Sequence, residues 1–233
     1  MLLSVVIPAY NEEKTIRSIL DRVRATPFEK EVLVIDDCSK DQTAKCVMDY
    51  IAEHGGEASG VRLLRHEVNK GKGAGLKTGF EAARGDVVII QDADLEYDPK
   101  DYAVLLRPIE EGLADVVYGS RFRGGTYVRV HMYWHYLGNK MLTTLSNMFT
   151  NLNLTDMETC YKVFRREVLQ GITIKSKRFA IEPELTAKIA KKRVRVYEVP
   201  ISYAGRGYAE GKKIGWRDAI SAFWAIVRFR FFD

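Results

Sequence analysis

The sequence predicts an α/β protein with a mostly parallel central sheet and helices on both faces. Along the first 120 residues, short runs rich in Val, Ile and Leu alternate with amphipathic helical patterns. Strands that are separated by helices pair in parallel and are covered on both sides. The 233 residues are 46% apolar and 29% charged, so the chain can build a core and is not intrinsically disordered.

Each expected element follows from its local pattern. In the first half we expect strands over residues 2–7, 31–35, 61–65, 87–90 and 115–118. The helices between them are expected over residues 11–23, with Asn11 as N-cap, and over 41–51, 73–83 and 101–111, the last three ending at glycines. The second half is expected to hold helices over 131–150, 184–192 and 216–232 and a strand over 194–199. No Pro- or Ser-rich linker separates the halves, so we expect one domain over residues 1–233.

The net charge of +5 is unevenly distributed. Residues 1–120 carry 15 Lys and Arg against 22 Asp and Glu, whereas residues 121–233 carry 21 against 9. A basic half indicates either an anionic partner or an ordinary solvated face. The basic runs lack the signatures of nucleic-acid-binding modules, so we expect no nucleic-acid partner.

Cysteine and hydropathy patterns bear on where the protein is found. Cys38, Cys46 and Cys160 are odd in number and form no CxxC, which excludes a disulfide framework and predicts a reducing compartment. The sequence has no basic segment before its first apolar run and no apolar stretch of about 18 residues. We therefore expect a cytoplasmic location, without a signal peptide or a membrane-spanning segment.

Polar and acidic residues follow three of the expected parallel strands, at residues 8–12, 36–41 and 92–96. Ligands of such sheets bind beyond the carboxyl ends of the strands. Alternate residues of an extended chain point the same way, so Asp92, Asp94 and Glu96 are expected to converge on one cation. Carboxylate oxygens suit Mg²⁺ or Mn²⁺ better than zinc. For any single aspartate here, a helix cap is the alternative.

Residues 69–75, NKGKGAG, form a glycine-rich segment before the third helix. The segment lacks the residue order of a P-loop, and it does not follow the first strand as a dinucleotide fingerprint would. A phosphate-binding loop and a plain turn before a packed helix fit it equally well.

The motifs together resemble a known family. PAYNE, IDDCSKDQT, NKGKGAGLKTGF and DADLE match family 2 glycosyltransferases of the GT-A fold, a Rossmann-like α/β fold, in order and spacing. The resemblance continues through GSRF, CYKVFR and VPISY, and is strongest to the branch of dolichyl-phosphate mannose synthase and polyprenyl-phosphate sugar transferases. Two stretches, METCY and IEPE, depart from the family pattern. The family implies residues 1–120 as the nucleotide-sugar half and 121–233 as the acceptor half.

The resemblance also implies residue roles. Residues expected to bind the nucleotide sugar are Pro8, Ala9, Tyr10, Glu12, Ile35, Asp37, Lys72, Asp92, Ala93 and Asp94. Asp92, Asp94 and Glu96 are the expected ligands of Mg²⁺ or Mn²⁺. The expected catalytic group is Asp94 with three cations near the phosphates, Arg121, Arg206 and Lys212.

These observations predict a metal-dependent hexosyltransferase. It would move a hexose from a UDP- or GDP-sugar to a polyprenyl phosphate at the cytoplasmic membrane face, where a membrane-embedded partner subunit could supply an anchor. A lipid phosphate is already an anionic nucleophile, so positioning replaces a strong base. One rival is a soluble transferase with a neutral acceptor, which needs a base such as Glu158, Glu182 or Glu184. The other is an inert nucleotide-sugar-binding subunit, against which the Asp92–Asp94 pair speaks.

The expected last helix, residues 216–232, combines an aromatic stripe with interspersed arginines. This composition is typical of a helix that lies in a membrane surface. A helix that covers the sheet would show a similar stripe, so the sequence leaves both roles open.

Overall fold

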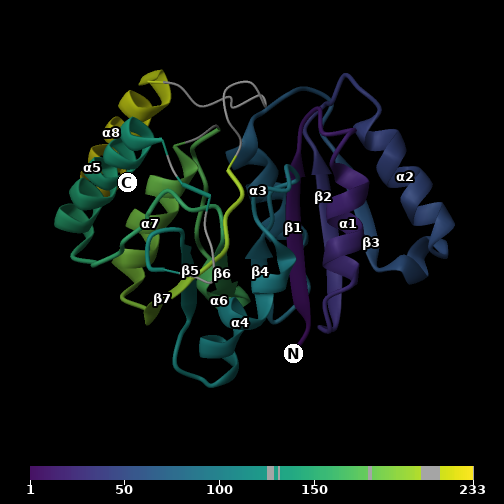
Figure 1. The fold of residues 1–233 in the computed structure, drawn as a ribbon, viewed down its shortest axis with the longest axis horizontal. Helices are drawn as coiled ribbons and strands as arrows, with labels where there is room; N and C mark the ends of the chain where they lie inside the picture. Colours follow the sequence, from purple (N-terminus) through teal and green to yellow (C-terminus); the bar gives the residue numbers. More distant parts are fainter. Residues whose placement is uncertain (125–128, 131, 178–179, 206–215, 233) are drawn as a thin grey trace.

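The computed structural model describes residues 1–233 except 125–128, 131, 178–179, 206–215 and 233. Within this part of the chain, a seven-stranded sheet lies at the centre in the order β3-β2-β1-β4-β6-β5-β7 (Figure 1). The strands are β1 (Leu3–Ala9), β2 (Lys30–Asp36), β3 (Val61–Arg65), β4 (Val87–Ile90), β5 (Val116–Ser120), β6 (Lys162–Arg165) and β7 (Val196–Pro200). All neighbouring pairs are parallel except those of β6, which runs antiparallel to β4 and β5.

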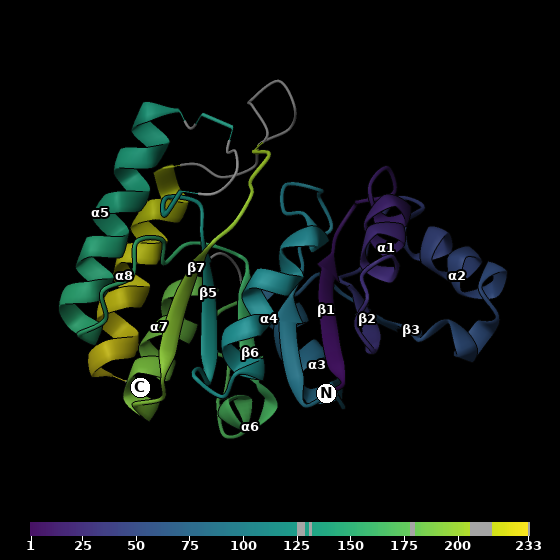
Figure 2. The same cartoon turned by 60° about the horizontal axis from the view of Figure 1, so that its bottom comes forward.

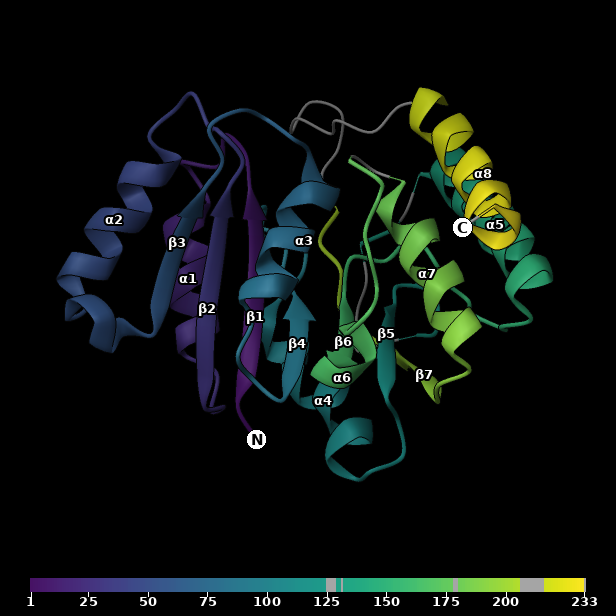
Figure 3. The same cartoon turned by 180° about the vertical axis from the view of Figure 1, so that it is seen from behind.

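Helices cover both faces of the sheet, as the sequence predicted. The helices are α1 (Ile16–Arg24), α2 (Thr43–Glu53), α3 (Lys72–Ala82), α4 (Tyr102–Glu110), α5 (Tyr133–Thr150), α6 (Arg166–Leu169), α7 (Ile181–Lys192) and α8 (Trp216–Phe231), with 3₁₀ turns η1 (Gly56–Ser59) and η2 (Pro99–Asp101). One apolar core joins one sheet face to α1, α2 and α4, and a second joins the other face to α3, α6 and α7 (Figure 3). Helices α5 and α8 pack side by side outside α7 (Figure 2).

The structure corrects two expected elements. Asn11 is not an N-cap, because α1 begins at Ile16 after Thr15. Asn11 instead takes a left-handed backbone conformation with φ of 55°, and its side chain accepts a hydrogen bond from the backbone N–H of Lys40. Strand β6 was not predicted, since its four residues Lys162–Arg165 begin and end in basic side chains. It makes the sheet mixed.

Helix α3 lies close against the sheet because of Gly79. A Cβ atom on Gly79 would lie 2.3 Å from Cγ1 of Val6 and 3.0 Å from Cδ1 of Ile35. Such distances leave no room for a methyl group in a packed interior. The glycine therefore sets how near α3, with Lys72 in its first turn, approaches β1 and β2.

Helix α8 has one buried side and one exposed side. Ala222, Ala225, Ile226 and Phe229 are buried against the neighbouring helices, whereas Trp224 is 65% exposed. Among the described residues, no helix has the length and apolar character needed to cross a bilayer.

Candidate active site

The loops after β1 and β2 are bound to each other at the carboxyl edge of the sheet. The N–H of Asn11 donates to Ser39 Oγ (2.9 Å), and the N–H of Glu12 donates to Thr43 Oγ1 (2.8 Å). In the other direction, the N–H of Lys40 donates to the Asn11 carboxamide (2.8 Å). These loops hold Tyr10 and Glu12, both partly exposed, at the expected nucleotide end of the sheet.

Asp37 is buried at the end of β2, and its carboxylate accepts several hydrogen bonds. It accepts hydrogen bonds from Nδ1 of His66 (2.7 Å) and from the backbone N–H groups of Lys70 (2.9 Å) and Gly71 (2.6 Å). Asp37 therefore shapes the glycine-rich segment, so this expected nucleotide-binding residue has a structural role.

Some of the expected donor-binding residues have their side chains in the core. Ile35 is fully buried, and Ala9 and Ala93 are nearly so. Such residues can meet a ligand only through their backbone. Pro8 is partly exposed and packs near Gly75 of α3.

Lys72 joins the loop after β4 to α7. Its ammonium lies 3.0 Å from Asp92 Oδ1, 3.0 Å from Cys160 Sγ and 3.3 Å from Glu182 Oε1. Burial by itself would lower the pKa of Lys72, but the Asp92 carboxylate and its other neighbours raise it well above the usual value. Burial likewise opposes ionisation of Asp92, but the Lys72 charge and the hydrogen bonds from Cys160 and Lys72 together lower the Asp92 pKa. The two side chains form a mostly buried ion pair.

The loop after β4 does not continue as an extended strand. Leu95 has a left-handed backbone with φ of 64°, and the N–H of Glu96 turns back to donate to Asp94 Oδ1 (3.1 Å). The alternation of an extended chain, from which the convergence of Asp92, Asp94 and Glu96 was predicted, therefore does not apply to this segment. Among the described residues, no three His, Cys, Asp or Glu side chains form a metal-binding group. Glu96 instead accepts a hydrogen bond from the Tyr203 hydroxyl (2.8 Å).

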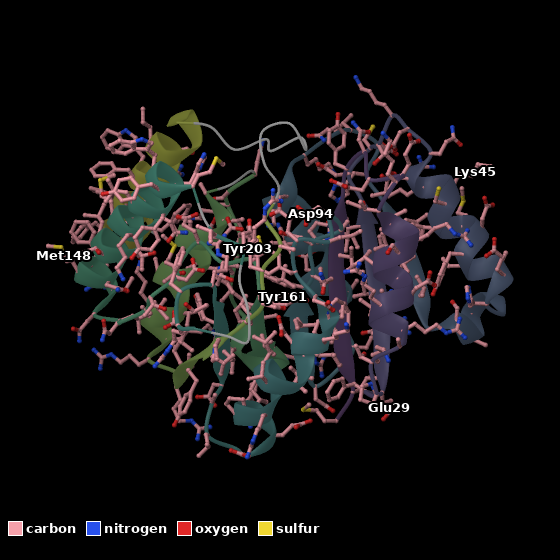
Figure 4. All side chains as sticks on the ribbon, viewed as in Figure 1. Glu29, Lys45, Asp94, Met148, Tyr161 and Tyr203 are labelled. Carbon is pink, nitrogen blue, oxygen red and sulfur yellow. The ribbon has the colours of Figure 1, made fainter. Side chains whose placement is uncertain are left out.

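The remaining carboxylates still suit a divalent cation. Asp92 and Asp94 offer oxygen ligands on one short loop at the end of β4, and Mg²⁺ is commonly held by one or two carboxylates with water and substrate phosphates. Figure 4 shows Asp94 and Tyr203 in the middle of the molecule, between the two helical flanks. This donor set fits a Mg²⁺ or Mn²⁺ ion that is shared with a phosphate ligand.

Arg121 follows β5 and is held by a partner that the sequence did not reveal. Its Nε and Nη2 donate to the two oxygens of Asp156 (2.6 and 2.7 Å), and its backbone N–H donates as well (3.1 Å). Asp156 is fully buried and the Arg121 side chain is 12% exposed. The Asp156 backbone N–H in turn donates to Glu198 of β7 (3.1 Å). Burial opposes ionisation of Asp156, but Arg121 outweighs it and lowers the Asp156 pKa.

The three glutamates considered as bases have different surroundings. Glu184 accepts hydrogen bonds from the N–H groups of Lys175 (2.7 Å) and Ser176 (2.6 Å) and from Lys188 (2.6 Å), so it organises the start of α7. Glu158 and Glu182 each have a buried oxygen that bonds to none of the described residues. Burial, together with the nearby Glu182 charge, raises the pKa of Glu158 to about 8.

Lys162 is a buried cation in β6 that sequence reasoning missed. Its ammonium donates to the carbonyl oxygens of Met157 (3.1 Å) and Thr159. Burial lowers its pKa despite the nearby glutamates. A lysine within a basic motif such as CYKVFR gives no sign of burial from sequence alone.

Arg206 and Lys212, expected to be catalytic, lie outside the described residues.

Comparison with known proteins identifies the class. Residues 4–173 match the family model "Glycosyl transferase family 2". The chain therefore belongs to glycosyl transferase family 2, and it is a glycosyltransferase.

Curated relatives are similar over most of the chain. An undecaprenyl-phosphate mannosyltransferase of Micrococcus luteus is 32% identical, with 92% of this chain and 88% of that protein covered. An undecaprenyl-phosphate 4-deoxy-4-formamido-L-arabinose transferase of Aeromonas hydrophila is 31% identical, covering 91% of this chain but 62% of that protein. The polyprenol monophosphomannose synthase of Mycolicibacterium smegmatis is 30% identical over 91% of this chain and 80% of its own.

A solved structure confirms the GT-A fold. Glucosyl-3-phosphoglycerate synthase from Mycobacterium tuberculosis, crystallised with Mn²⁺ and UDP-glucose, superposes with a TM-score of 0.73. The match covers 98% of this chain and 78% of that chain at 20% identity.

Proposed function

We propose that the protein transfers a hexose from a nucleoside diphosphate sugar to a polyprenyl phosphate at the cytoplasmic face of a membrane, with Mg²⁺ or Mn²⁺ as cofactor. The observation that carries the proposal is one connected site: the carboxylates after β4 are linked through Glu96 and Tyr203 to the Arg121 guanidinium. The carboxylates proposed to hold the metal and the cation proposed to bind the acceptor are thus adjacent. The names of the relatives, which include polyprenyl-phosphate sugar transferases, support the same acceptor class.

The donor binds along the carboxyl edge of β1, β2 and β4. Asp92 and Asp94 would hold the divalent ion, which supplies charge stabilisation to the departing diphosphate. Lys72, beside Asp92, adds a cation at the same place. The Tyr10–Glu12 loop and the segment shaped by Asp37 border the nucleotide.

The acceptor phosphate is held by Arg121. The bonds to Asp156 use Nε and one N–H of Nη2, and no described residue hydrogen-bonds Nη1. An arginine fixed along one edge presents its remaining N–H groups in a set direction, which suits an anionic phosphate. The phosphate oxygen then attacks the sugar without needing a base. Arg206 and Lys212 are expected to add to this charge.

The outer helices α5 and α8 supply a surface for the lipid. Large apolar side chains on them are exposed, among them Trp134 (76%), Met148 (76%) and Trp224 (65%). The exposed cations Lys140, Arg228 and Arg230 lie on the same two helices. Aromatic residues next to arginines are typical of helices that lie in the interface of an anionic membrane. The partner subunit in the membrane stays a prediction.

One observation favours the second candidate, a transferase with a hydroxyl acceptor. Glu158 lies near Arg121 and Glu182, and its pKa of about 8 is close to that of an effective base at neutral pH. A hydroxyl nucleophile would need such a base, whereas a phosphate would not.

The test is a product analysis. Purified enzyme is mixed with Mg²⁺ or Mn²⁺, a polyprenyl phosphate and a panel of UDP- and GDP-hexoses, and products are identified by mass spectrometry. We expect a polyprenyl monophosphate hexose that disappears with excess EDTA and with Asp94→Asn. Full product formation in excess EDTA would reject the metal, and a glycosylated neutral acceptor alone would favour the second candidate.

A further inference from the structure

The segment after β7 touches both sides of the site. The hydroxyl of Tyr203 donates to Glu96 Oε2 (2.8 Å), and the N–H of Ala204 donates to the Glu96 carbonyl (3.0 Å). The ring of the same tyrosine faces Arg121, whose Cζ lies 5.1 Å from the ring centroid. One side chain therefore contacts the donor-side loop with its hydroxyl and the acceptor-side cation with its ring.

We propose that Tyr203 is a positioning residue with two separable effects. Its hydroxyl holds the loop after β4 in the shape that receives the donor diphosphate, and its ring orients the Arg121 guanidinium toward the acceptor phosphate. This inference rests on the proposed function, because it assigns the two effects to the two substrates of that reaction.

The donor-side effect follows from how Glu96 is connected. The chain reverses at Leu95, and the N–H of Glu96 donates to Asp94 Oδ1. A left-handed conformation is costly for leucine and persists only where its surroundings hold it. The bonds from Tyr203 and Ala204 to Glu96 supply part of that support. Loss of the hydroxyl would therefore loosen the geometry of Asp94.

The Tyr203 hydroxyl lies 2.8 Å from Glu96 Oε2, within hydrogen-bonding distance of a carboxylate that can only accept. A protonated hydroxyl can donate to a carboxylate, so the direction of the hydrogen bond is fixed. Phenylalanine at this position would keep the ring and remove only this donor.

The acceptor-side effect follows from the surroundings of Arg121. Asp156 holds one edge of its guanidinium, and the Tyr203 ring and the Phe122 ring (5.6 Å) lie near it. Cation–π contact with an aromatic ring restricts the plane of an arginine. The ring thus leaves the unbonded Nη1 edge facing a fixed direction.

A merely structural tyrosine would behave differently. Tyr203 also packs against Tyr97 of the core, with ring centroids 5.2 Å apart. If packing were its whole role, removing the hydroxyl would change neither nucleotide affinity nor the acceptor KM. Removing the ring would then weaken the binding of both substrates together. The proposed roles instead predict that removing the hydroxyl weakens donor binding and leaves the acceptor KM unchanged.

The experiment compares Tyr203→Phe, Tyr203→Leu and a control, Tyr197→Phe, at a tyrosine of β7 that is 43% exposed. Calorimetry with UDP or GDP and Mg²⁺ measures the donor side without turnover. The KM for a polyprenyl phosphate, at saturating donor, measures the acceptor side.

We expect Tyr203→Phe to weaken nucleoside diphosphate binding about fivefold, the effect of one hydrogen bond, and to leave the acceptor KM within about twofold of wild type. Tyr203→Leu should weaken nucleotide binding to the same extent and also raise the acceptor KM about fivefold or more, through loss of the cation–π contact. Tyr197→Phe should match wild type in both.

The inference would be overturned if Tyr203→Phe changed nucleotide affinity and the acceptor KM equally, or changed neither. It would also be overturned if Tyr203→Leu weakened nucleotide binding and left the acceptor KM unchanged. If Tyr203→Leu does not fold, the contrast within Tyr203→Phe decides by itself. A wild type that binds nucleotide but never uses a lipid phosphate would overturn the proposed function, and this inference with it. An active wild type with indistinguishable Tyr203 variants overturns the inference alone.

Discussion

The ion pair of Arg121 and Asp156 has the same hydrogen-bond pattern as a second, more exposed ion pair in the protein. Comparing the two pairs measures how much burial adds to the contribution of the Arg121 pair to the free energy of unfolding. In both pairs the arginine donates from its backbone N–H, Nε and Nη2 to the two oxygens of one aspartate. The second pair joins Arg195 to Asp115. The pairs differ in burial: the arginine side chains are 12% and 55% exposed, and the aspartate side chains 0% and 19%.

The two perturbations are Asp156→Asn and Asp115→Asn, which remove one charge each at nearly constant volume. Asp156→Asn leaves a mostly buried guanidinium without its counterion, which costs about 3 kcal/mol of unfolding free energy. Asp115→Asn breaks the more exposed pair with Arg195 and a looser contact with Arg165 (3.7 Å), for which the loss is about 0–1 kcal/mol. The structure thus predicts a difference of about 2–3 kcal/mol between chemically identical substitutions.

Urea unfolding followed by circular dichroism at pH 7 measures both losses. The slope of free energy against urea should be unchanged, so that the midpoint alone reports stability. Equal losses in the two variants would refute the reasoning, because they would mean that burial of the Arg121 pair does not set its strength. A small loss for Asp156→Asn would have the same meaning.

Three further predictions follow from single features. Gly79→Ala should destabilise the protein by about 1–3 kcal/mol in urea unfolding, because its methyl group meets Val6, whereas Gly138→Ala, with nothing within 4 Å, should not destabilise it; equal effects would contradict this packing. The raised pKa of Glu158 means that the folded state binds one more proton than the unfolded state between about pH 4.5 and 8. The unfolding free energy of wild type should therefore fall as the pH rises through this range, relative to that of Glu158→Gln. Parallel pH profiles of the two proteins would contradict the raised pKa. Replacing Trp134 and Trp224 by Ser should reduce sedimentation with anionic vesicles at low salt, whereas Met48→Ser, 49% exposed on α2, should not; equal sedimentation of all three proteins would argue against the α5–α8 surface.

Local pattern predicted much of the first half of the fold. Strands such as β1 and β4 consist mostly of apolar residues, so local pattern is enough to define them. Strand β6 escaped prediction because its stability comes from pairing with β4 and β5, which are far from it in the sequence. Such long-range pairing leaves little trace in a four-residue run.

The sequence names the candidate site residues but not the contacts that surround them. Asp92 and Asp94 were named from their place after a strand, and Arg121 from the family resemblance, but the partners of these residues depend on contacts across the chain. Asp156, 35 residues from Arg121, lies in a loop without any regular spacing. The reversal at Leu95 also depends on contacts, since it is supported by the segment around Tyr203. Periodicity therefore could not predict the turn between Asp94 and Glu96.

The most direct test of the proposed reaction compares two acceptors that differ only in the phosphate. With the nucleotide sugar that the enzyme uses, initial rates of hexose transfer are measured for a polyprenyl phosphate and for the polyprenol of the same chain length. An acceptor phosphate that serves as the nucleophile predicts product from the phosphate alone, at a rate that falls when Arg121 is replaced by Gln. Equal rates with both lipids, or transfer to the alcohol alone, would contradict the anionic acceptor site and would assign the base role to Glu158.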